Sequence, residues 1–494
     1  MTAPDLGPPT FLSARFVGPD TDVRYARRVT CWIRGFGVAA GGWRLPTKDV
    51  NAAWGRPGGR GQSAVVAADE DALTLGWAAA TRALDAAGMT PEQVESMWWG
   101  TSRAPFGEGP SWTHLAATLR LGPTCGGTVI SGSTHSGCDA LAAALDALES
   151  GRLATTLVVM SDALNPAVGG SLEAVAGAGA VAVIVGSTGP GARITGTGSV
   201  WAPVLDRYRG DSEDETRDAY DGRLFREQIF LPLMGKAATG SDAGRWSIPD
   251  PDGRMAATLG QRIGAAEVVS APSRSELGDC GAAATLVGSA AALGATGPIS
   301  LLFYGAGRAT RFDLDVDSAV PGAERSQVDL SGGRLVGYPE VLRSRRRLVT
   351  TGESVEMAVP PGSAMFVRGN HETLGFLGGR CTKCATINIP PSIHPTCISC
   401  GATEFDEVAL ARTGTVHTFV INQTMPQPFE APLPLIVTDL DDGSRIQLQG
   451  ATDGSDIAVG TRVEAVLRRY TIERGVPIYG WKFQPITTRA EVAS

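Results

Sequence analysis

The segment GAGAVAVIVG, residues 177–186, is an uninterrupted run of small and apolar residues between two glycines. An apolar run of this length, without alternating polar positions, is typical of a strand that is buried on both faces. Such strands occur in sheets that carry helices on both sides. The segment therefore predicts the α/β class for the part of the chain that surrounds it.

Helical and strand-like patterns alternate on both sides of this segment. Residues 71–88 have apolar side chains at helical spacing and end on Gly88, a suitable C-cap. Before the segment, further elements are predicted at 96–100, 128–131, 136–148 and 156–160, the third of them a helix. After about residue 200 the order partly repeats, with helices at 255–263 and 282–293 and a strand at 299–304. We therefore expect two comparable α/β halves in tandem.

Beyond residue 365 the sequence changes character, and short alternating runs are separated by turn residues. These runs are found at 415–421, 434–439, 444–449, 462–470 and 477–483. Five short strands in so short a stretch are typical of a small barrel or sandwich. We expect three units: an α/β domain at residues 28–350, a cysteine-containing ribbon at 365–410 and an all-β domain at 411–487.

Two CxxC pairs, Cys381 with Cys384 and Cys397 with Cys400, lie twelve residues apart. Two such turns can close a tetrahedral thiolate shell around one Zn²⁺, and four sulfur ligands leave no open position for catalysis. The spacing therefore predicts a structural zinc site. Free or disulfide-bonded cysteines are the alternative, and His394, which lies between the pairs, could replace one ligand.

The overall composition excludes two classes of partner. The formal net charge is −8, which gives no electrostatic footprint for nucleic acid. No apolar run reaches the roughly 18–20 residues of a membrane span, and the N-terminal residues lack the basic head and apolar core of a secretory signal. We therefore expect a cytoplasmic protein that binds neither nucleic acid nor membrane.

The C-terminal region resembles the OB-fold proteins that accompany acyl-CoA enzymes. The resemblance is carried by GRCTKC, the two prolines of INIPPSIHPTC, CISCGA, GTVHTFVI and LIVTDLDDG, within about residues 365–485. It implies a zinc ribbon followed by an OB-fold barrel. In that family the domain is often a separate subunit bound to a thiolase-fold enzyme, and it is thought to help bind or channel acyl-CoA.

The N-terminal region resembles the thiolase superfamily, and hydroxymethylglutaryl-CoA synthase in particular. STHSGCDALAAALDAL at 133–148 resembles the superfamily's nucleophile helix. The other matching strings are EAVAGAGAVAVIVG, DRYR at 206–209, FLPLMGK at 230–236, LGDCGAAATLVGSAAAL at 277–293 and FYGAGRATRF at 303–312. The resemblance implies a thiolase-like, duplicated α/β domain that binds coenzyme A thioesters and forms a homodimer.

The family's catalytic residues are replaced at the matching positions of this chain. The nucleophilic cysteine corresponds to Thr134, the histidine to Leu231, the asparagine to Asp279 and the acid/base glutamate to Ser102. Lys236 remains, and the resemblance implies that it meets the phosphates of coenzyme A. Leucine cannot exchange a proton, and threonine is a poor nucleophile without an adjacent base.

Several residues remain as alternative carriers of chemistry. Cys138 lies one helical turn beyond Thr134 and could act as the nucleophile with His135 as its base, although a cysteine in an alanine-rich helix is usually packed in the core. Asp279 could support an altered chemistry. The backbone N–H groups of the turn at Gly305 and Gly307 could stabilise a thioester oxyanion.

Two functions follow as hypotheses. The first is an acyl-CoA-binding relative of acyltransferases that forms or cleaves a carbon–carbon bond at a thioester. The second is a non-catalytic module that holds acyl-CoA or a separate thiolase subunit, with the OB domain completing the acyl-CoA tunnel.

Overall fold

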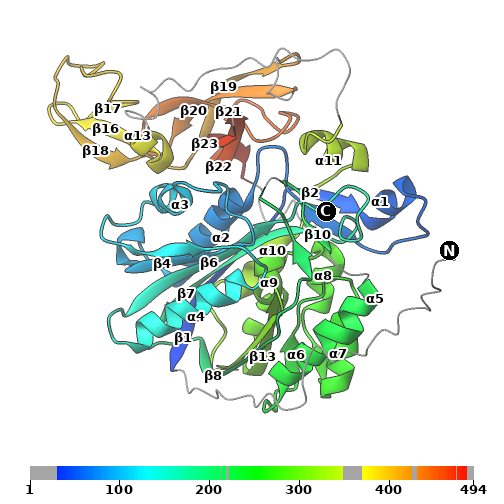
Figure 1. Ribbon diagram of the computed structural model, residues 1–494. Helices are drawn as coiled ribbons and strands as arrows, with labels where there is room; N and C mark the ends of the chain where they lie inside the picture. The colour runs from blue at the N-terminus through cyan, green and yellow to red at the C-terminus, as the bar shows by residue number, and fades with distance from the viewer. Residues whose placement is uncertain are drawn as a thin grey trace, which may run out of the picture.

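Ten strands form the central sheet of the N-terminal part (Figure 1). The computed structural model describes residues 30–211, 213–218, 222–348, 370–425, 431–473 and 475–486. The strand order is β12-β11-β13-β14-β8-β1-β7-β6-β4-β5. The strand bounds are β1 Cys31–Ala40, β4 Ser96–Gly100, β5 Gly126–Ile130, β6 Thr155–Ala163, β7 Ala178–Gly186, β8 Ala192–Trp201, β11 Arg245–Ser247, β12 Glu267–Val268, β13 Gly297–Gly305 and β14 Arg308–Val316.

The sheet consists of two halves with the same topology. The first half has the order β5-β4-β6-β7-β1 and the second has the order β12-β11-β13-β14-β8. In each half the first three strands of this order are parallel to one another. The fourth strand is antiparallel to the third, and the fifth strand is antiparallel to the fourth. The halves meet where β1 pairs with β8. This repeat confirms the duplicated, thiolase-like α/β fold predicted from the sequence.

Strand β7 contains the segment that predicted the fold, and all of its residues are buried. Val181, Val183 and Val185 belong to one hydrophobic core, whereas Ala182 and Ile184 belong to another. Helix α4 (Ser136–Glu149) contributes to the first core and helix α2 (Ala72–Ala87) to the second. The strand is apolar throughout because both of its faces are covered by a helix.

Local sequence signals set the ends of α2. The Asp71 side chain accepts hydrogen bonds from the backbone N–H groups of Leu73 and Thr74, and the Thr74 side chain completes a capping box. Gly88 ends the helix with φ +62°, a left-handed conformation that glycine adopts without strain. In the second half, α6 (Leu231–Ala238) precedes β11 and α9 (Ala284–Leu293) precedes β13, as α2 precedes β4 and α4 precedes β6. Helix α7 (Met255–Ile263) lies between β11 and β12.

The C-terminal part has a ribbon and a closed barrel, as predicted. The ribbon sheet contains β16 (Leu377–Cys381), β17 (Ile387–Asn388) and β18 (Phe405–Ala409). The barrel closes in the order β19-β20-β21-β23-β22. Its strands are β19 Thr413–Asn422, β20 Leu433–Leu440, β21 Arg445–Gly450, β22 Arg462–Glu473 and β23 Val476–Pro485. The domain limits stay a prediction, since residues 28–29, 349–350, 365–369 and 487 lie outside the described ranges.

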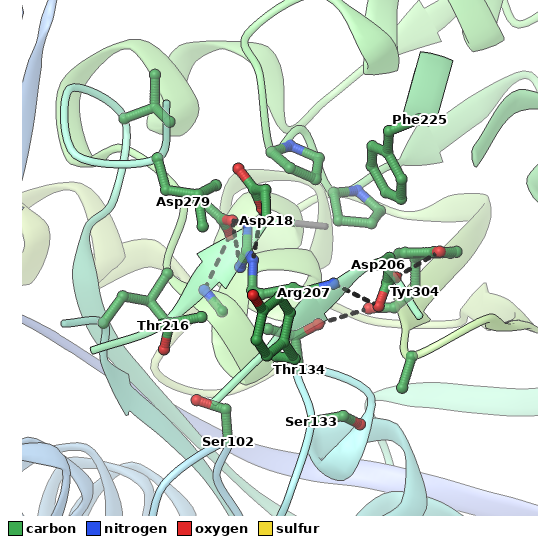
Figure 2. A pocket seen from close by; sticks show the side chains of 18 of the residues that line it. Ser102, Ser133, Thr134, Asp206, Arg207, Thr216, Asp218, Phe225, Asp279 and Tyr304 are labelled. Atoms are coloured by element: carbon green, nitrogen blue, oxygen red, sulfur yellow. Dashed lines mark hydrogen bonds and ion pairs between the residues drawn. The ribbon is translucent and has the colours of Figure 1, made fainter. Parts of the chain in front are cut away.

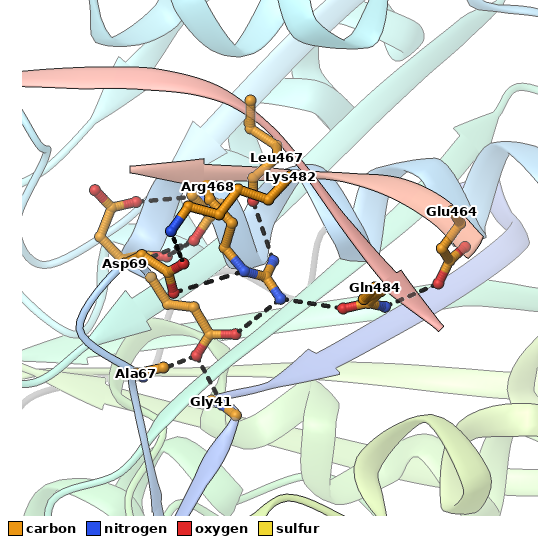
Figure 3. A network of polar contacts seen from close by, with 12 residues as sticks. Gly41, Ala67, Asp69, Glu464, Leu467, Arg468, Lys482 and Gln484 are labelled. Atoms are coloured by element: carbon orange, nitrogen blue, oxygen red, sulfur yellow. Dashed lines mark hydrogen bonds and ion pairs between the residues drawn. The ribbon is translucent and has the colours of Figure 1, made fainter. Parts of the chain in front are cut away.

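The barrel packs against α2 and α3 (Ser111–Leu119) of the large domain. The Trp77 and Trp481 rings meet edge to face with centroids 5.2 Å apart, and the Arg412 guanidinium lies over both rings. Figure 3 shows the polar part of this contact, where Asp69 meets Arg468 and Lys482. A shared apolar core and buried ion pairs therefore hold the two parts together.

None of the helices in the described part of the chain is long and apolar enough to cross a membrane.

Candidate active-site cavity

A cavity of about 320 Å³ opens where loops from both halves of the sheet meet (Figure 2). Ser102 and Thr134 come from the first half, and Asp279 and Tyr304 come from the second. The structure therefore brings together three of the positions that the resemblance singled out, Ser102, Thr134 and Asp279. These residues are far apart in sequence, and the duplicated sheet places them in one site.

The lining of the cavity is unlike that of a covalent thiolase. Among the described residues that line it there is no cysteine, histidine, lysine or glutamate. The lining residues run from Ser102 to Ala306, so the described ribbon and barrel contribute none of them. The described part of the OB domain is docked on α2 and α3 and does not line this cavity, and its completion of an acyl-CoA tunnel stays a prediction.

Thr134 lies in the turn before α4, in contact with the hairpin between β13 and β14. Its hydroxyl donates a 3.0 Å hydrogen bond to the carbonyl oxygen of Tyr304. A Cβ on Gly305 would lie 2.4 Å from the backbone nitrogen of His135, so only glycine allows this close approach. Ala306 and Gly307 form the two-residue turn with φ +49° and +71°, as a type I′ hairpin requires.

Two residues of the cavity lining have a backbone N–H group without a hydrogen-bond partner in the described part of the chain. These residues are Thr134 and Ala306. Gly305 and Gly307, the residues predicted for this role, shape the turn but are not among the lining residues. A pair of free N–H groups can stabilise an oxygen that gains negative charge.

Arg207 is one of three arginines that line the cavity, and it lies beside two of the lining carboxylates. Its two terminal nitrogens each lie 3.3 Å from Oδ2 of Asp279, and its Nε atom lies 4.0 Å from Oδ1 of Asp218. In Figure 2 the guanidinium points toward these two carboxylates. Asp206 accepts 2.6 Å hydrogen bonds from the Tyr304 hydroxyl and from the backbone N–H of Arg207. Burial and the nearby Asp206 carboxylate raise the pKa of Tyr304, so its hydroxyl stays protonated.

Asp162, at the end of β6, joins the two halves beneath the cavity and was missed by the sequence analysis. Its carboxylate accepts hydrogen bonds from the hydroxyl and N–H of Ser102 and from the N–H of Ala282, between 2.7 and 2.8 Å. Burial raises the pKa of Asp162 to about 6 despite these donors. Its position, at the carboxyl end of the apolar strand β6, was the available signal, since ligand sites lie at that edge of a sheet.

Two predicted residues lie outside the cavity lining. Cys138 is buried in the core that α4 shares with β7. The His135 ring is also buried, with Nε2 3.0 Å from the Thr310 hydroxyl and Nδ1 3.2 Å from Asp139. Burial opposes its charge, but the neighbouring Cys138 thiol and Asp139 carboxylate raise the pKa of His135 to about 9. Their proposed pairing as nucleophile and base therefore finds no support from the cavity.

Leu231 and Lys236 lie on α6 (Leu231–Ala238), and neither lines the cavity. Leu231 is buried in the apolar core between α6 and α7, where a proton-transferring side chain would be desolvated. Lys236 is half-buried, and its contact with coenzyme A phosphates stays a prediction.

The four cysteines of the ribbon converge as expected for one metal ion. Their sulfur atoms all lie within 4.8 Å of one another, with Cys381 and Cys400 3.6 Å apart and Cys384 and Cys397 3.5 Å apart. A tetrahedron with Zn–S bonds of about 2.3 Å has edges of about 3.8 Å, so the donor set fits Zn²⁺. Hydrogen bonds from Thr386 lower the pKa of the Cys384 thiol to about 6, which favours the thiolate that a metal binds.

Comparison with known proteins divides the chain in the same way as the structure. A family model described as the C-terminal OB-fold domain of ChsH2 matches residues 407–468. A DUF35 domain-containing scaffold protein of Methanocaldococcus jannaschii is 37 % identical over 117 residues, which cover 22 % of this chain and 82 % of that protein. Hydroxymethylglutaryl-CoA synthase of Pyrococcus furiosus is 31 % identical over 155 residues, which cover 31 % of this chain and 44 % of the enzyme.

Solved structures agree with the fold of the large domain. MvaS in complex with 3-hydroxy-3-methylglutaryl coenzyme A superposes with a TM-score of 0.56 at 21 % identity, covering 67 % of this chain and 94 % of that one. An HMG-CoA synthase complexed with CoA gives a TM-score of 0.56 at 16 % identity, covering 64 % and 90 %. In sequence, the chain spans about half the length of several curated synthases that it matches.

Proposed function

Because the C-terminal part of the chain belongs to the DUF35 domain family and its N-terminal part is homologous to hydroxymethylglutaryl-CoA synthases, we propose that the protein binds an acyl-CoA thioester. We further propose that it does so without forming a covalent acyl-enzyme. The observation that carries this proposal is the cavity itself. It lies at the position expected for a thiolase-fold active site, and its described lining contains no cysteine and no histidine.

Thr134 is a poor candidate for a nucleophile in this geometry. Its hydroxyl proton is committed to the carbonyl oxygen of Tyr304, which cannot accept a proton as a base would. Each of the four carboxylates that line the cavity accepts a hydrogen bond on at least one oxygen, from Arg207 at Asp279, Tyr304 at Asp206, Ser171 at Asp218 and Arg226 at Asp252. A threonine without an adjacent base attacks a thioester slowly, so the covalent step of the relatives is not expected here.

The same geometry is suited to holding a thioester. We propose that its carbonyl oxygen accepts hydrogen bonds from the N–H groups of Thr134 and Ala306. The thioester carbonyl would then be polarised, and the adjacent carbon would be more acidic. Any chemistry would form or cleave a carbon–carbon bond next to that carbonyl, as in acyltransferase relatives, but through a non-covalent complex.

Restoring the missing nucleophile tests the proposal. The purified chain is incubated with acetyl-CoA, and its intact mass is measured alongside the affinity for the thioester by calorimetry. We expect acetyl-CoA to bind the unmodified protein without any mass increase. Thr134→Cys should gain one acetyl group, because a cysteine there would lie beside the two N–H donors.

Ser133→Cys is the matched control, since Ser133 is the preceding residue of the same turn and also lines the cavity. It should gain less acetyl label than Thr134→Cys. An acetyl adduct on the unmodified protein, mapped to Thr134 or Cys138, would contradict the proposal, and so would the absence of any coenzyme A binding.

A second function, a scaffold that holds a separate thiolase subunit, is favoured by one observation on the ribbon. Ile393 and Ile398 are exposed by 68 % and 76 % on the loops around the cysteine pairs. We propose that these two isoleucines belong to an apolar surface that contacts another protein. This role would be supported if the natural chain co-purifies with a thiolase from the same organism and the Ile398→Asp variant does not. If the thiolase co-purifies equally with the natural chain and with the variant, the ribbon is excluded as the contact.

A further inference from the structure

The ion pair between Arg207 and Asp218 contains a gap. The Nε atom of Arg207 and Oδ1 of Asp218 are 4.0 Å apart, too far for a hydrogen bond and close enough for one atom between them. Both residues line the cavity, and their side chains are 18 % and 26 % exposed. The gap therefore opens on the cavity in which we propose that the acyl-CoA thioester binds.

Both sides of the gap have unused hydrogen-bonding capacity. A guanidinium has five N–H donors, and Arg207 directs one from each terminal nitrogen to Asp279. Its Nε–H has no hydrogen-bond partner within the described residues. Asp218 accepts a 2.6 Å hydrogen bond from the Ser171 hydroxyl on Oδ2, while Oδ1 has no hydrogen-bond partner in the same ranges. The gap thus offers one charged donor and one charged acceptor.

The surrounding charge decides which group fits there. Two carboxylates, Asp218 and Asp279, lie within 4.0 Å of the Arg207 guanidinium, and Asp206 precedes it in the chain. Arg103 and Arg209 also line the cavity, and Arg103 is paired with Asp214. At the gap itself two carboxylates surround one guanidinium, so a ligand carboxylate would be repelled there. A carbonyl group could use only the donor, since it has no proton to give to Asp218.

A hydroxyl group satisfies both sides at once. A hydroxyl oxygen about 2.8 Å from both Arg207 Nε and Asp218 Oδ1 would make an angle of about 90° between them, which is within the range of hydrogen-bond geometry. It would accept from the guanidinium and donate to the carboxylate. We propose that Arg207 and Asp218 form a hydroxyl-recognition subsite, and that the ligand is a hydroxyacyl-CoA thioester without a carboxylate on its acyl chain.

This inference rests on the proposed acyl-CoA binding, and a panel of four-carbon thioesters separates the two. Affinities of the full chain are measured for butyryl-CoA, 3-hydroxybutyryl-CoA, 4-hydroxybutyryl-CoA and succinyl-CoA. We expect at least one hydroxybutyryl-CoA to bind about tenfold more tightly than butyryl-CoA, as hydrogen bonds to charged groups predict. Succinyl-CoA should bind more weakly than butyryl-CoA.

Two variants assign the preference to the gap. Arg207→Met keeps the length of the side chain and removes the donor, and Asp218→Ala removes the acceptor. Each should abolish the preference, so that the variant binds hydroxybutyryl-CoA and butyryl-CoA with equal affinity. Arg217→Met is the control, because Arg217 precedes Asp218 but pairs with Glu213 outside the cavity lining.

The outcomes that overturn the subsite differ from those that overturn the proposed function. Equal affinity for butyryl-CoA and both hydroxybutyryl-CoA thioesters, or tighter binding of succinyl-CoA, would overturn the subsite alone. A preference that survives both substitutions would do the same. If Arg207→Met fails to fold because Asp279 is left unpaired, Asp218→Ala decides the question. If none of the four thioesters binds, both proposals fall.

Discussion

Lys482 of the barrel lies with its Nζ atom 2.7 Å from Oδ2 of Asp69 in the large domain. The Lys482 side chain is 9 % exposed and that of Asp69 is 18 % exposed, so the pair is largely shielded from water. Arg468 lies 3.7 Å from the other oxygen of Asp69 and 3.6 Å from Glu70. The contact between the large domain and the barrel therefore includes opposite charges that are largely buried beside their partners.

Asp69→Ala should destabilise the docked barrel. The substitution leaves Lys482 buried without its closest carboxylate, and removing one partner of a buried pair typically costs about 3–5 kcal/mol. We expect chemical denaturation to separate into two transitions, with the barrel unfolding or undocking first. Asp317→Ala, which removes the exposed partner of Arg193, should cost less than about 1 kcal/mol. A single, unshifted transition for Asp69→Ala would contradict this interpretation.

The ribbon should contain one zinc ion per chain. Replacing Cys397, which is buried, with serine removes one of four thiolates and should reduce the zinc content measured by mass spectrometry. Tryptic cleavage after Lys383 should become faster, because this residue lies within the first CxxC turn and depends on the metal for its conformation. Cys125→Ser, outside the cluster, should change neither quantity. Iron in place of zinc, or no metal, would contradict the prediction.

Gly305→Ala should disturb the cavity through the backbone. The added Cβ would lie 2.4 Å from the backbone nitrogen of His135 and 2.6 Å from the hydroxyl oxygen of Thr134, so the hairpin must move away. We expect a loss of about 1–3 kcal/mol in the free energy of unfolding and weaker acyl-CoA binding. At Gly107 a Cβ would meet nothing within 4 Å, so Gly107→Ala should leave the free energy of unfolding and the acyl-CoA affinity unchanged. Similar behaviour of the two variants would show that the close approach is not required.

Asp162 should make stability depend on pH in a defined window. Its pKa is about 6 in the folded chain against 3.8 for an ordinary aspartate, so the folded state binds the proton more tightly. Its stabilising contribution is therefore greatest below about pH 4 and falls, by about 3 kcal/mol, as the pH rises to about 6 and above. The stability difference between the natural protein and Asp162→Asn should follow that fall in urea titrations. A difference that is constant or rises with pH would contradict it.

A homodimer stays a prediction, and the edge of the sheet offers a place to test it. Strand β5 is the last strand of the ten-stranded sheet, and Gly126, Gly127 and Thr128 on it are exposed. An exposed edge strand can pair with a second copy of the chain. Light scattering should report a dimer, and Thr128→Lys should favour the monomer, because lysine on an edge strand opposes pairing. A monomer in the natural protein would exclude the dimer.

Local signals in the sequence were enough for most secondary structure. The helix predicted at 71–88 is α2, bounded by Asp71 and Gly88, and the strand predicted at 96–100 is β4. Strands β8 and β14 escaped prediction because polar residues such as Thr197 and Asp313 interrupt their apolar patterns. These two strands are instead stabilised by backbone hydrogen bonds to each other along their length, which a local hydrophobic pattern does not reveal.

The sequence by itself determined the α/β fold and the convergence of the four cysteines. Each depends on contacts close in the chain: β7 is apolar throughout, and each CxxC pair places two sulfurs on one turn. Only the tertiary structure decided the content of the cavity. Arg207 meets Asp279 across 72 residues, and Asp69 meets Lys482 across 413. Such pairs are set by how whole sheets and domains pack, so no local pattern could reveal them.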